Sequence, residues 1–242
     1  MGILSENDAR EIRKILADME GEVTLTIFTQ KLECETCPES EMIVSELTEL
    51  SDRLSMVRIN PLQDKGRAEE LGVERVPAIL VSDGSHARVR FYGLPSGYEF
   101  SSLLTAIVDA GRSGDLVESA TRGFLDRLGI DLDMKVFVTP TCPYCPRAVV
   151  LAHRLAASSE RVRAEAIEAN EYPLLSTKYR VQGVPRTVIN DRYYVEGALP
   201  EIHLVQALEK ALADEKAEPG EIDLVRYLEP PSEAEAEESG PE

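Results

Sequence analysis

The sequence predicts an α/β fold built from two tandem copies of one domain of about 108 residues. Six residues recur after the same shift of 108 positions: Cys34, Cys37, Pro38, Ile59, Val76 and Pro77 recur as Cys142, Cys145, Pro146, Ile167, Val184 and Pro185. Each half also alternates β-forming runs with amphipathic helical runs in the same order. The 242 residues are enough for two domains of ordinary size.

The first copy begins with a helix whose N-cap we expect at Ser5, because Asp8 lies three residues later, as in a capping box. The run VTLTIFT is rich in β-forming residues and predicts a strand over 23–29. The further elements are a helix that opens at the CxxC motif, a strand at 55–60, a short helix at 64–71, a hairpin of strands at 77–82 and 87–92, and a helix at about 97–110.

The second copy repeats this order. Its elements are a helix at about 115–128, a strand at 134–139, a CxxC helix that ends near Ser158, a strand at 161–168, a short helix near 171–179, a hairpin that turns at Asn190-Asp191, and a helix at about 200–212. In each copy the βαβ part requires a parallel pair and the hairpin adds antiparallel strands. We therefore expect a central four-stranded mixed sheet, flanked by helices, in each copy.

The expected domains are 1–112 and 113–213, joined near GRSG at 111–114, with an acidic tail at 214–242. The join is short, so we expect the copies to pack against each other. The tail holds 11 acidic and 2 basic side chains and is rich in Pro, Glu and Ser, so we expect it to be disordered. Its one apolar segment, IDLVRYL at 222–228, is expected to pack on the second copy.

The net charge of −18 argues against binding to nucleic acid, whose phosphates would repel the chain. No run approaches the roughly 18 apolar residues of a membrane span, and residues 1–14 do not resemble a signal peptide. The expected location is therefore the cytoplasm. Asn and Gln together number 8, which suggests a thermophile, although a GC-rich genome explains the composition equally well.

All four cysteines fall in two CxxC pairs, which in an intracellular protein indicates metal binding or redox chemistry. In TPTCPYCP, the spacing of Cys142 and Cys145 at a helix start puts both sulfurs on one face, within disulfide reach. With Pro143 at about the first helical position, Cys142 would face unpaired N–H groups, which favour its thiolate. Cys145, one turn deeper, would then resolve the mixed disulfide.

Pro146 does not fit this helix register. If the helix opens at Cys142, Pro146 lies at about its fourth position, where it removes a helical N–H and crowds a carbonyl. Pro38 repeats the feature in the first copy. We expect a loose or irregular first turn at both places.

The CPYC motif, followed by Val184-Pro185 on this strand order, resembles the glutaredoxin branch of the thioredoxin superfamily. Two such domains in one chain resemble the protein disulfide oxidoreductases of thermophilic archaea and bacteria, over residues 5–213. The resemblance implies that Cys142 is the nucleophile, that Cys145 resolves, and that Pro185 is cis beside the disulfide. It also implies that the Val184 backbone pairs with an extended substrate, and Tyr144 is expected to shape the exposed site.

The first copy departs from this pattern, because its CETC motif has Glu35 and Thr36 where the second copy has Pro143 and Tyr144. The Glu35 charge opposes a thiolate, so we expect Cys34 to be less acidic than Cys142. The site keeps Cys37 and Val76-Pro77, and we expect it to be a secondary redox site in which Val76 and Pro77 contact the substrate. The buried Asp typical of thioredoxins is replaced by Phe28 and Val136, which favours the glutaredoxin-like interpretation.

Alternatives remain for these residues. The 104 residues between the CxxC pairs do not match a compact zinc module, and we expect no metal site. Structural disulfides, or an iron–sulfur cluster shared with glutathione, are the other options. Arg147 could bind a glutathione carboxylate or be solvated, and His153 is too far from Cys142 to act as its base, so we expect it at the surface or in packing.

These observations predict an enzyme, a protein dithiol–disulfide oxidoreductase that acts on protein disulfides or thiols as reductase, oxidase or isomerase. We expect no bound cofactor, with electrons from a separate NADPH-dependent, thioredoxin-reductase-like flavoprotein or from glutathione. One alternative is an electron-transfer module that feeds a peroxiredoxin, since the chain also resembles the tandem-fold N-terminal part of the alkyl hydroperoxide reductase flavoprotein. It has no G-x-G-x-x-G motif and would need a separate reductase. Another is a non-catalytic, chaperone-like scaffold.

Overall fold

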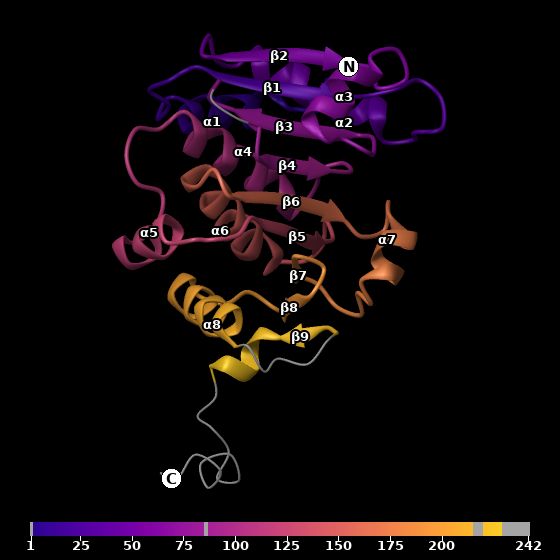
Figure 1. The fold of residues 1–242 in the computed structure, drawn as a ribbon. Coiled ribbons are helices and arrows are strands. Elements are labelled where there is room, and N and C mark those ends of the chain that lie inside the picture. Colours follow the sequence, from indigo (N-terminus) through magenta and orange to yellow (C-terminus); the bar gives the residue numbers. More distant parts are fainter. Residues whose placement is uncertain (1, 85–86, 215–219, 229–242) are drawn as a thin grey trace, which may run out of the picture.

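The computed structural model describes residues 2–84, 87–214 and 220–228 (Figure 1). The first copy holds α1 (Glu6–Leu16), β1 (Val23–Phe28), α2 (Cys37–Thr48), β2 (Leu54–Ile59), α3 (Lys65–Leu71), β3 (Ala78–Ser82), β4 (Val89–Tyr92) and α4 (Tyr98–Ala110). The second copy holds α5 (Ser119–Asp126), β5 (Leu132–Val138), α6 (Cys145–Ser158), β6 (Val162–Glu168), α7 (Pro173–Lys178), β7 (Arg186–Ile189), β8 (Tyr193–Glu196) and α8 (Glu201–Ala213). The predicted order of elements is confirmed in both copies.

The strands form one continuous sheet in the order β2-β1-β3-β4-β6-β5-β7-β8-β9, in which β9 is the short strand Ile222–Asp223. Within each copy, the βαβ strands pair in parallel and the hairpin strands pair antiparallel, which confirms the two predicted four-stranded mixed sheets. The two sheets join where β4 pairs in parallel with β6, with Val89 opposite Ala164 and Tyr92 opposite Ile167. The copies therefore share a backbone hydrogen-bond ladder as well as side-chain packing.

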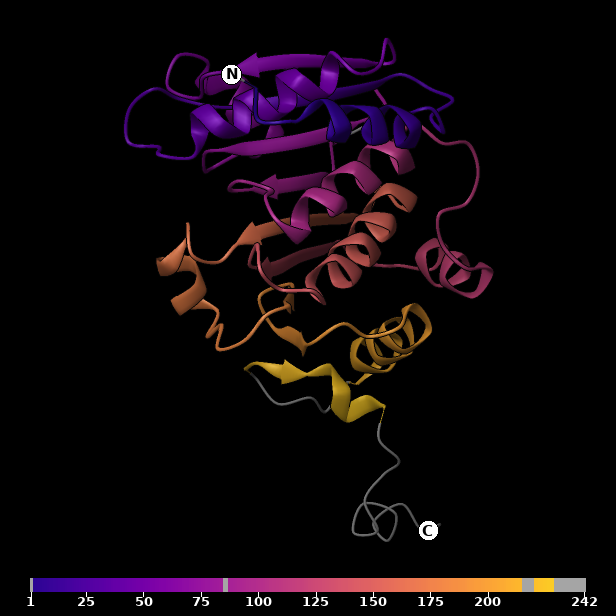
Figure 2. The same cartoon turned by 180° about the vertical axis from the view of Figure 1, so that it is seen from behind.

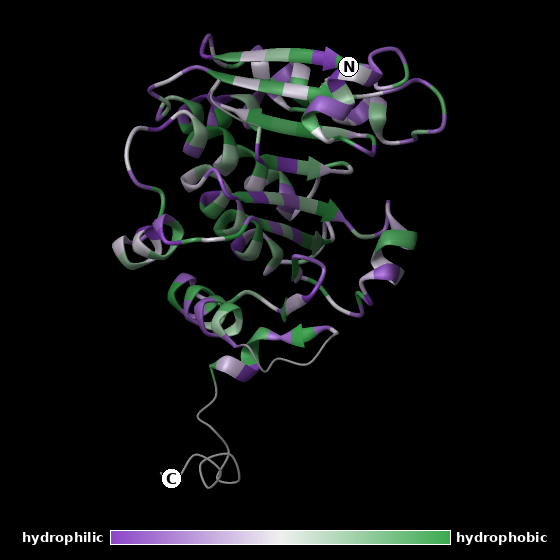
Figure 3. Ribbon diagram, in the orientation of Figure 1, coloured by the Kyte–Doolittle hydropathy of each residue, from purple (hydrophilic) through white to green (hydrophobic). Residues whose placement is uncertain are grey.

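Helices cover both faces of the sheet. The larger apolar core lies between the sheet and α1, α2, α4, α6 and α8, and α4 packs directly on α6 across the junction of the copies (Figure 2). A smaller core lies on the other face under α3 and α7, where it holds Phe28 and Phe137. Along β3, which is almost entirely hydrophobic in Figure 3, successive side chains alternate between these two cores.

Local sequence signals set several element ends. The Ser5 hydroxyl accepts the Asp8 N–H and the Asp8 carboxylate accepts the Ser5 N–H, so the predicted capping box at α1 is confirmed. At the β7–β8 hairpin, Asn190 and Asp191 have φ of 52° and 55°, which is the left-handed conformation of a tight turn. Asn and Asp tolerate this left-handed conformation better than most residues.

After α8, the chain returns to the sheet. Residues Ile222–Asp223 form β9, which pairs in parallel with β8, and Leu224–Tyr227 form a 3-10 helix that packs on α8. The predicted packing of 222–228 on the second copy is thus confirmed. The disorder expected for 215–219 and 229–242 lies outside the described residues. Among the described helices, none combines the length and apolar character needed to cross a membrane.

Candidate redox sites

The second CxxC motif lies between the C-terminal end of β5, an interior strand of the sheet, and the start of α6. Cys142 and Cys145 form a disulfide with their Cα atoms 5.5 Å apart, within the usual range for such a bond. Cys145 is fully buried, while Cys142 keeps 8% of its surface exposed. Cys142 is thus the more exposed of the two cysteines.

The helix register at both motifs differs from the prediction. Helix α6 begins at Cys145 with Tyr144 as its N-cap, and α2 begins at Cys37, so the prediction that the helix opens at the first cysteine is wrong. Pro146 and Pro38 therefore lie in the first helical turn, where a residue without an N–H breaks no helical hydrogen bond. The first turn of α2 is regular, since the Ser40 N–H donates to the Thr36 carbonyl four residues back at 2.9 Å. The first turn of α6 is tighter, since the Arg147 N–H donates to the Tyr144 carbonyl three residues back at 3.3 Å, and Pro143 lies before the helix.

The start of α6 nevertheless faces the Cys142 sulfur. The Cys145 N–H, the first of the helix, donates to Cys142 Sγ at 3.2 Å. This N–H has no partner within the helix, and it lies at the positive end of the helix dipole. When the disulfide is reduced, the same N–H is placed to stabilise a thiolate on Cys142.

The Val-Pro pairs lie beside the redox sites. Both Val76-Pro77 and Val184-Pro185 have cis peptide bonds, as the resemblance implied for Pro185. The Val184 carbonyl oxygen lies 3.6 Å from Cys142 Sγ. Among the described residues, neither the Val184 N–H nor the Val76 N–H has a hydrogen-bond partner. This backbone is free to pair with an incoming chain.

Three further side chains singled out in the sequence lie at the motif or along α6. Tyr144 is 63% exposed beside the motif, and Arg147 is exposed on the first turn of α6. His153 is buried, its Nε2 lies 3.2 Å from the Arg90 carbonyl oxygen, and its ring meets Phe91 edge-on at 4.7 Å. Burial lowers the pKa of His153 to about 4. The histidine is therefore a packing residue at the junction of the copies, which is one of its two predicted roles.

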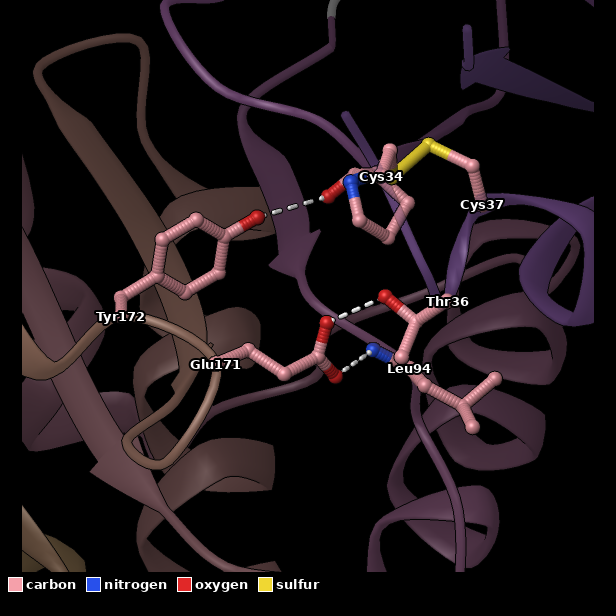
Figure 4. Close-up of a disulfide and its surroundings, with 7 residues drawn as sticks. Cys34, Thr36, Cys37, Leu94, Glu171 and Tyr172 are labelled. Atoms are coloured by element: carbon pink, nitrogen blue, oxygen red, sulfur yellow. Dashed lines mark hydrogen bonds between the residues drawn. A yellow bond between two sulfur atoms is a disulfide. The ribbon is translucent and has the colours of Figure 1, made fainter. Parts of the chain in front are cut away.

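The first CxxC motif has the same frame. Cys34 and Cys37 form a disulfide with their Cα atoms 5.4 Å apart, with Cys37 buried and Cys34 half-buried. Glu35 points to solvent, whereas the hydroxyl of Thr36 donates to the carboxylate of Glu171 at 2.5 Å (Figure 4). The same carboxylate accepts the Leu94 N–H at 2.6 Å.

Sequence reasoning missed three residues near these sites. Glu171 and Tyr172 belong to the second copy but contact the first motif, and no repeat or spacing signal predicts such a contact. Glu99 is buried in the first turn of α4. This turn lies beside the loop that leads to Cys142, since the Tyr98 N–H donates to the Pro140 carbonyl at 2.9 Å. Burial raises the pKa of Glu99 to about 7.

All four cysteines are paired in the two disulfides. Across residues 2–84, 87–214 and 220–228, no group of three or more His, Cys, Asp or Glu side chains is arranged to hold a metal ion.

The fold and the two CxxC sites define a thioredoxin-fold protein, and comparison with known proteins agrees. A family model described as "Thioredoxin domain" matches residues 132–210. A probable thioredoxin of Archaeoglobus fulgidus is 38% identical over 85 residues, which are 34% of this chain and 92% of that protein. The crystal structure of a protein disulfide oxidoreductase from Aeropyrum pernix is 31% identical with a TM-score of 0.80, covering 89% of this chain and 97% of that one.

The chain belongs to the tandem thioredoxin-fold disulfide oxidoreductases. It is also similar to the alkyl hydroperoxide reductase AhpF of Escherichia coli, with 24% identity over 181 residues that make up 74% of this chain. The chain spans about a third of the length of that relative, since the match covers 33% of it.

Proposed function

We propose that the chain exchanges disulfides with protein substrates, mainly at Cys142 and Cys145. The observation that carries this proposal is the position of Cys142 Sγ, which lies between the first N–H of α6 and the Val184 carbonyl. One group favours the thiolate, and the other belongs to a backbone segment with a free N–H.

In the reductive direction, the Cys142 thiolate attacks one sulfur of a substrate disulfide. A bond forms between Cys142 and that sulfur, and the other substrate sulfur leaves as a thiolate that takes up a proton. Cys145 then loses its proton and attacks Cys142, which releases the second substrate thiol and forms the Cys142–Cys145 disulfide. The substrate gains two electrons and two protons, and the reverse sequence oxidises a substrate dithiol.

The substrate would bind as an extended segment. The unpaired Val184 N–H next to cis-Pro185 can form a short β-type ladder with a substrate backbone, which places a substrate sulfur beside Cys142. Tyr144, exposed beside the motif, would contact the same substrate segment. Recognition through backbone groups suits an enzyme that acts on many protein sequences.

We propose Cys34 and Cys37, with Val76 and Pro77, as a second site of the same kind. It has the same disulfide, the same cis bond and the same free backbone N–H. Its direction of exchange depends on its reduction potential relative to that of the second pair.

The test is to trap the intermediate. With Cys145→Ser, the mixed disulfide between Cys142 and a substrate protein cannot be resolved, so a covalent adduct should accumulate on non-reducing gels. Cys142→Ser should form no adduct at this site and should lower insulin-disulfide reduction at least about tenfold. Cys34→Ser/Cys37→Ser is the matched control, because it removes the other pair and leaves Cys142 able to release its substrate. Equal adduct formation by Cys142→Ser and Cys145→Ser, each in a Cys34→Ser background, would refute the assignment.

The source of electrons and the location are part of the proposal. We propose that no cofactor is bound and that a separate NADPH-dependent, thioredoxin-reductase-like flavoprotein or glutathione reduces the disulfides. The cytoplasm is the proposed location, because all four cysteines form redox-type pairs rather than a structural framework.

A second candidate function is electron transfer to a peroxiredoxin. The similarity to the alkyl hydroperoxide reductase of Escherichia coli favours it, since that match covers most of this chain. Peroxide turnover would be measured with the chain, a peroxiredoxin and a pyridine-nucleotide flavoprotein. Rapid turnover in this system, together with no exchange with protein disulfides, would favour the second candidate over the first.

A further inference from the structure

The first redox site is completed by a loop of the second copy. This loop, residues 169–172, follows β6, and its Glu171 accepts hydrogen bonds from the Thr36 hydroxyl at 2.5 Å and the Leu94 N–H at 2.6 Å. Thr36 lies between Cys34 and Cys37, and Figure 4 shows the Glu171 carboxylate pointing at it from the neighbouring copy. The second copy thus holds the turn that carries the two cysteines.

The adjacent Tyr172 contacts the other side of the same site. Its hydroxyl donates to the Pro77 carbonyl at 3.3 Å, an oxygen that also accepts the Gly93 N–H at 3.0 Å. Pro77 is the cis-proline of the first site. The loop therefore contacts both the motif and the cis-proline segment.

The loop is itself fixed in place. The Glu168 carboxylate accepts the Glu171 N–H at 2.6 Å and the Asn170 side-chain N–H at 2.8 Å. Gly93 has φ of 90°, and a Cβ there would lie 2.7 Å from Glu168 Cβ and 2.9 Å from Glu171 Oε1. A glycine is thus required where the loop approaches the first copy.

The internal repeat does not reproduce this arrangement at the other site. The residue 108 positions before Glu171 is Gln63, which lines a groove of the first copy together with Leu32 and Met42. The hairpin strand β4 of the first copy pairs with β6 of the second copy, whereas the equivalent strand β8 pairs with the short β9. The tandem order of the copies makes the two redox sites unequal.

We propose that Glu171 is a positioning residue of the first redox site, which fixes the turn between the cysteines and whose charge opposes the Cys34 thiolate. A negative charge close to a thiol disfavours its ionisation, and the thiolate is the attacking species. The other charged groups near the pair in the sequence are Lys31, Glu33 and Glu35 in its own loop, Glu39 in the first turn of α2, and Arg75 before the cis-proline. The inference rests on the proposed function of Cys34 and Cys37 in thiol exchange.

The test measures the reactivity of Cys34 itself. In a Cys142→Ser/Cys145→Ser background, the reduced protein is alkylated with iodoacetamide between pH 5 and 9. Glu171→Gln keeps the shape of the side chain but removes its charge, so Cys34 should react about three- to tenfold faster at pH 7, with the profile moved to lower pH. Glu160→Gln, which removes an exposed charge just before the opposite end of β6, should leave the profile unchanged.

A double-mutant cycle separates positioning from charge alone. Thr36→Val removes the hydroxyl that anchors Glu171, so the effect of Glu171→Gln on the alkylation rate should be smaller in that variant. If Glu171→Gln does not fold, Thr36→Val alone still tests the proposal, because it removes the contact between Glu171 and the motif. An unchanged profile in Glu171→Gln, or an equal shift in Glu160→Gln, would overturn the proposal.

This readout needs no protein substrate. If the chain failed to exchange disulfides with proteins while Glu171→Gln still changed Cys34 alkylation, the proposed function would fail and the role of Glu171 would stand. If the chain exchanged disulfides with proteins but Glu171→Gln did not change Cys34 alkylation, the proposed function would stand and the role of Glu171 would fail. A purely structural role would lower the melting temperature without moving the alkylation profile.

Discussion

At the residue scale, Glu99 is an acid that is buried without hydrogen-bond partners among the described residues. It lies in the first turn of α4 with 3% of its surface exposed. Burial raises its pKa from 4.5 to about 7, and the nearby Ser102 hydroxyl, which makes no well-formed hydrogen bond to it, acts in the opposite direction. An ionised carboxylate at this position opposes folding.

Glu99→Gln should therefore make stability less dependent on pH. Below pH 4.5 the acid is protonated in both the folded and the unfolded state, so its contribution to stability is fully present. Between pH 4.5 and 7 the unfolded state releases the proton first, and stability falls by on the order of 3 kcal/mol as pH rises through the folded pKa. The glutamine cannot ionise, so the loss between pH 5 and pH 8 should be smaller by about that amount.

The measurement is urea unfolding of both proteins at pH 5 and pH 8. Glu69→Gln, at an exposed position, is the control and should follow the wild type at both pH values. Parallel curves for Glu99→Gln and the wild type would show that the carboxylate is solvated. The sequence does not distinguish Glu99 from the exposed glutamates, because its burial depends on how α4 packs against the second copy.

At the scale of elements, the proline that follows each CxxC motif sets the helix start. A helix opened at Cys142 would put Pro146 in its interior, whereas α6 opens at Cys145 and places Pro146 in the first turn. The apolar spacing predicted the element correctly, but its first residue, Cys145, lies two positions later than the expected Pro143. The missing N–H of Pro146 is the stronger local constraint, and it favours a helix that begins at the second cysteine.

Pro146→Ala should thus change the free energy of unfolding by less than about 1 kcal/mol, because the added N–H replaces no missing helical bond. Had Pro146 stood in the helix interior, its removal would stabilise the protein by about 3 kcal/mol. Chemical denaturation of both proteins in the oxidised state decides between these values. Pro38→Ala gives a second measurement at the equivalent position of α2.

At the scale of the whole molecule, the two copies are joined through the sheet. The sequence repeat predicted two similar sheets, but the parallel pairing of β4 with β6 could not be predicted, since β4 is a short hairpin strand with no signal for a second partner. The contact of Glu171 with Thr36 follows from this pairing, because it joins residues 135 positions apart in different copies. Internal repeats predict contacts within a copy but do not predict contacts between copies.

The contact region between the two copies is packed like the interior of a single domain. Arg90 on β4 and Glu165 on β6 are both buried, with their charged groups 4.0 Å apart, and Phe91 packs against His153 of α6. The main apolar core runs without a break from β1 of the first copy to α8 of the second. Such continuity favours unfolding as one cooperative unit rather than as two independent domains.

Leu25→Ala tests this cooperativity from one end of the molecule. Leu25 is fully buried on β1, and its truncation should lower the free energy of unfolding by about 2–5 kcal/mol. If the copies unfold together, the slowest-exchanging amides of β5, in the other copy, should lose the same protection as those of β1. Hydrogen exchange measured strand by strand gives both values, and faster exchange in β1 with unchanged exchange in β5 would show that the shared sheet does not make one folding unit.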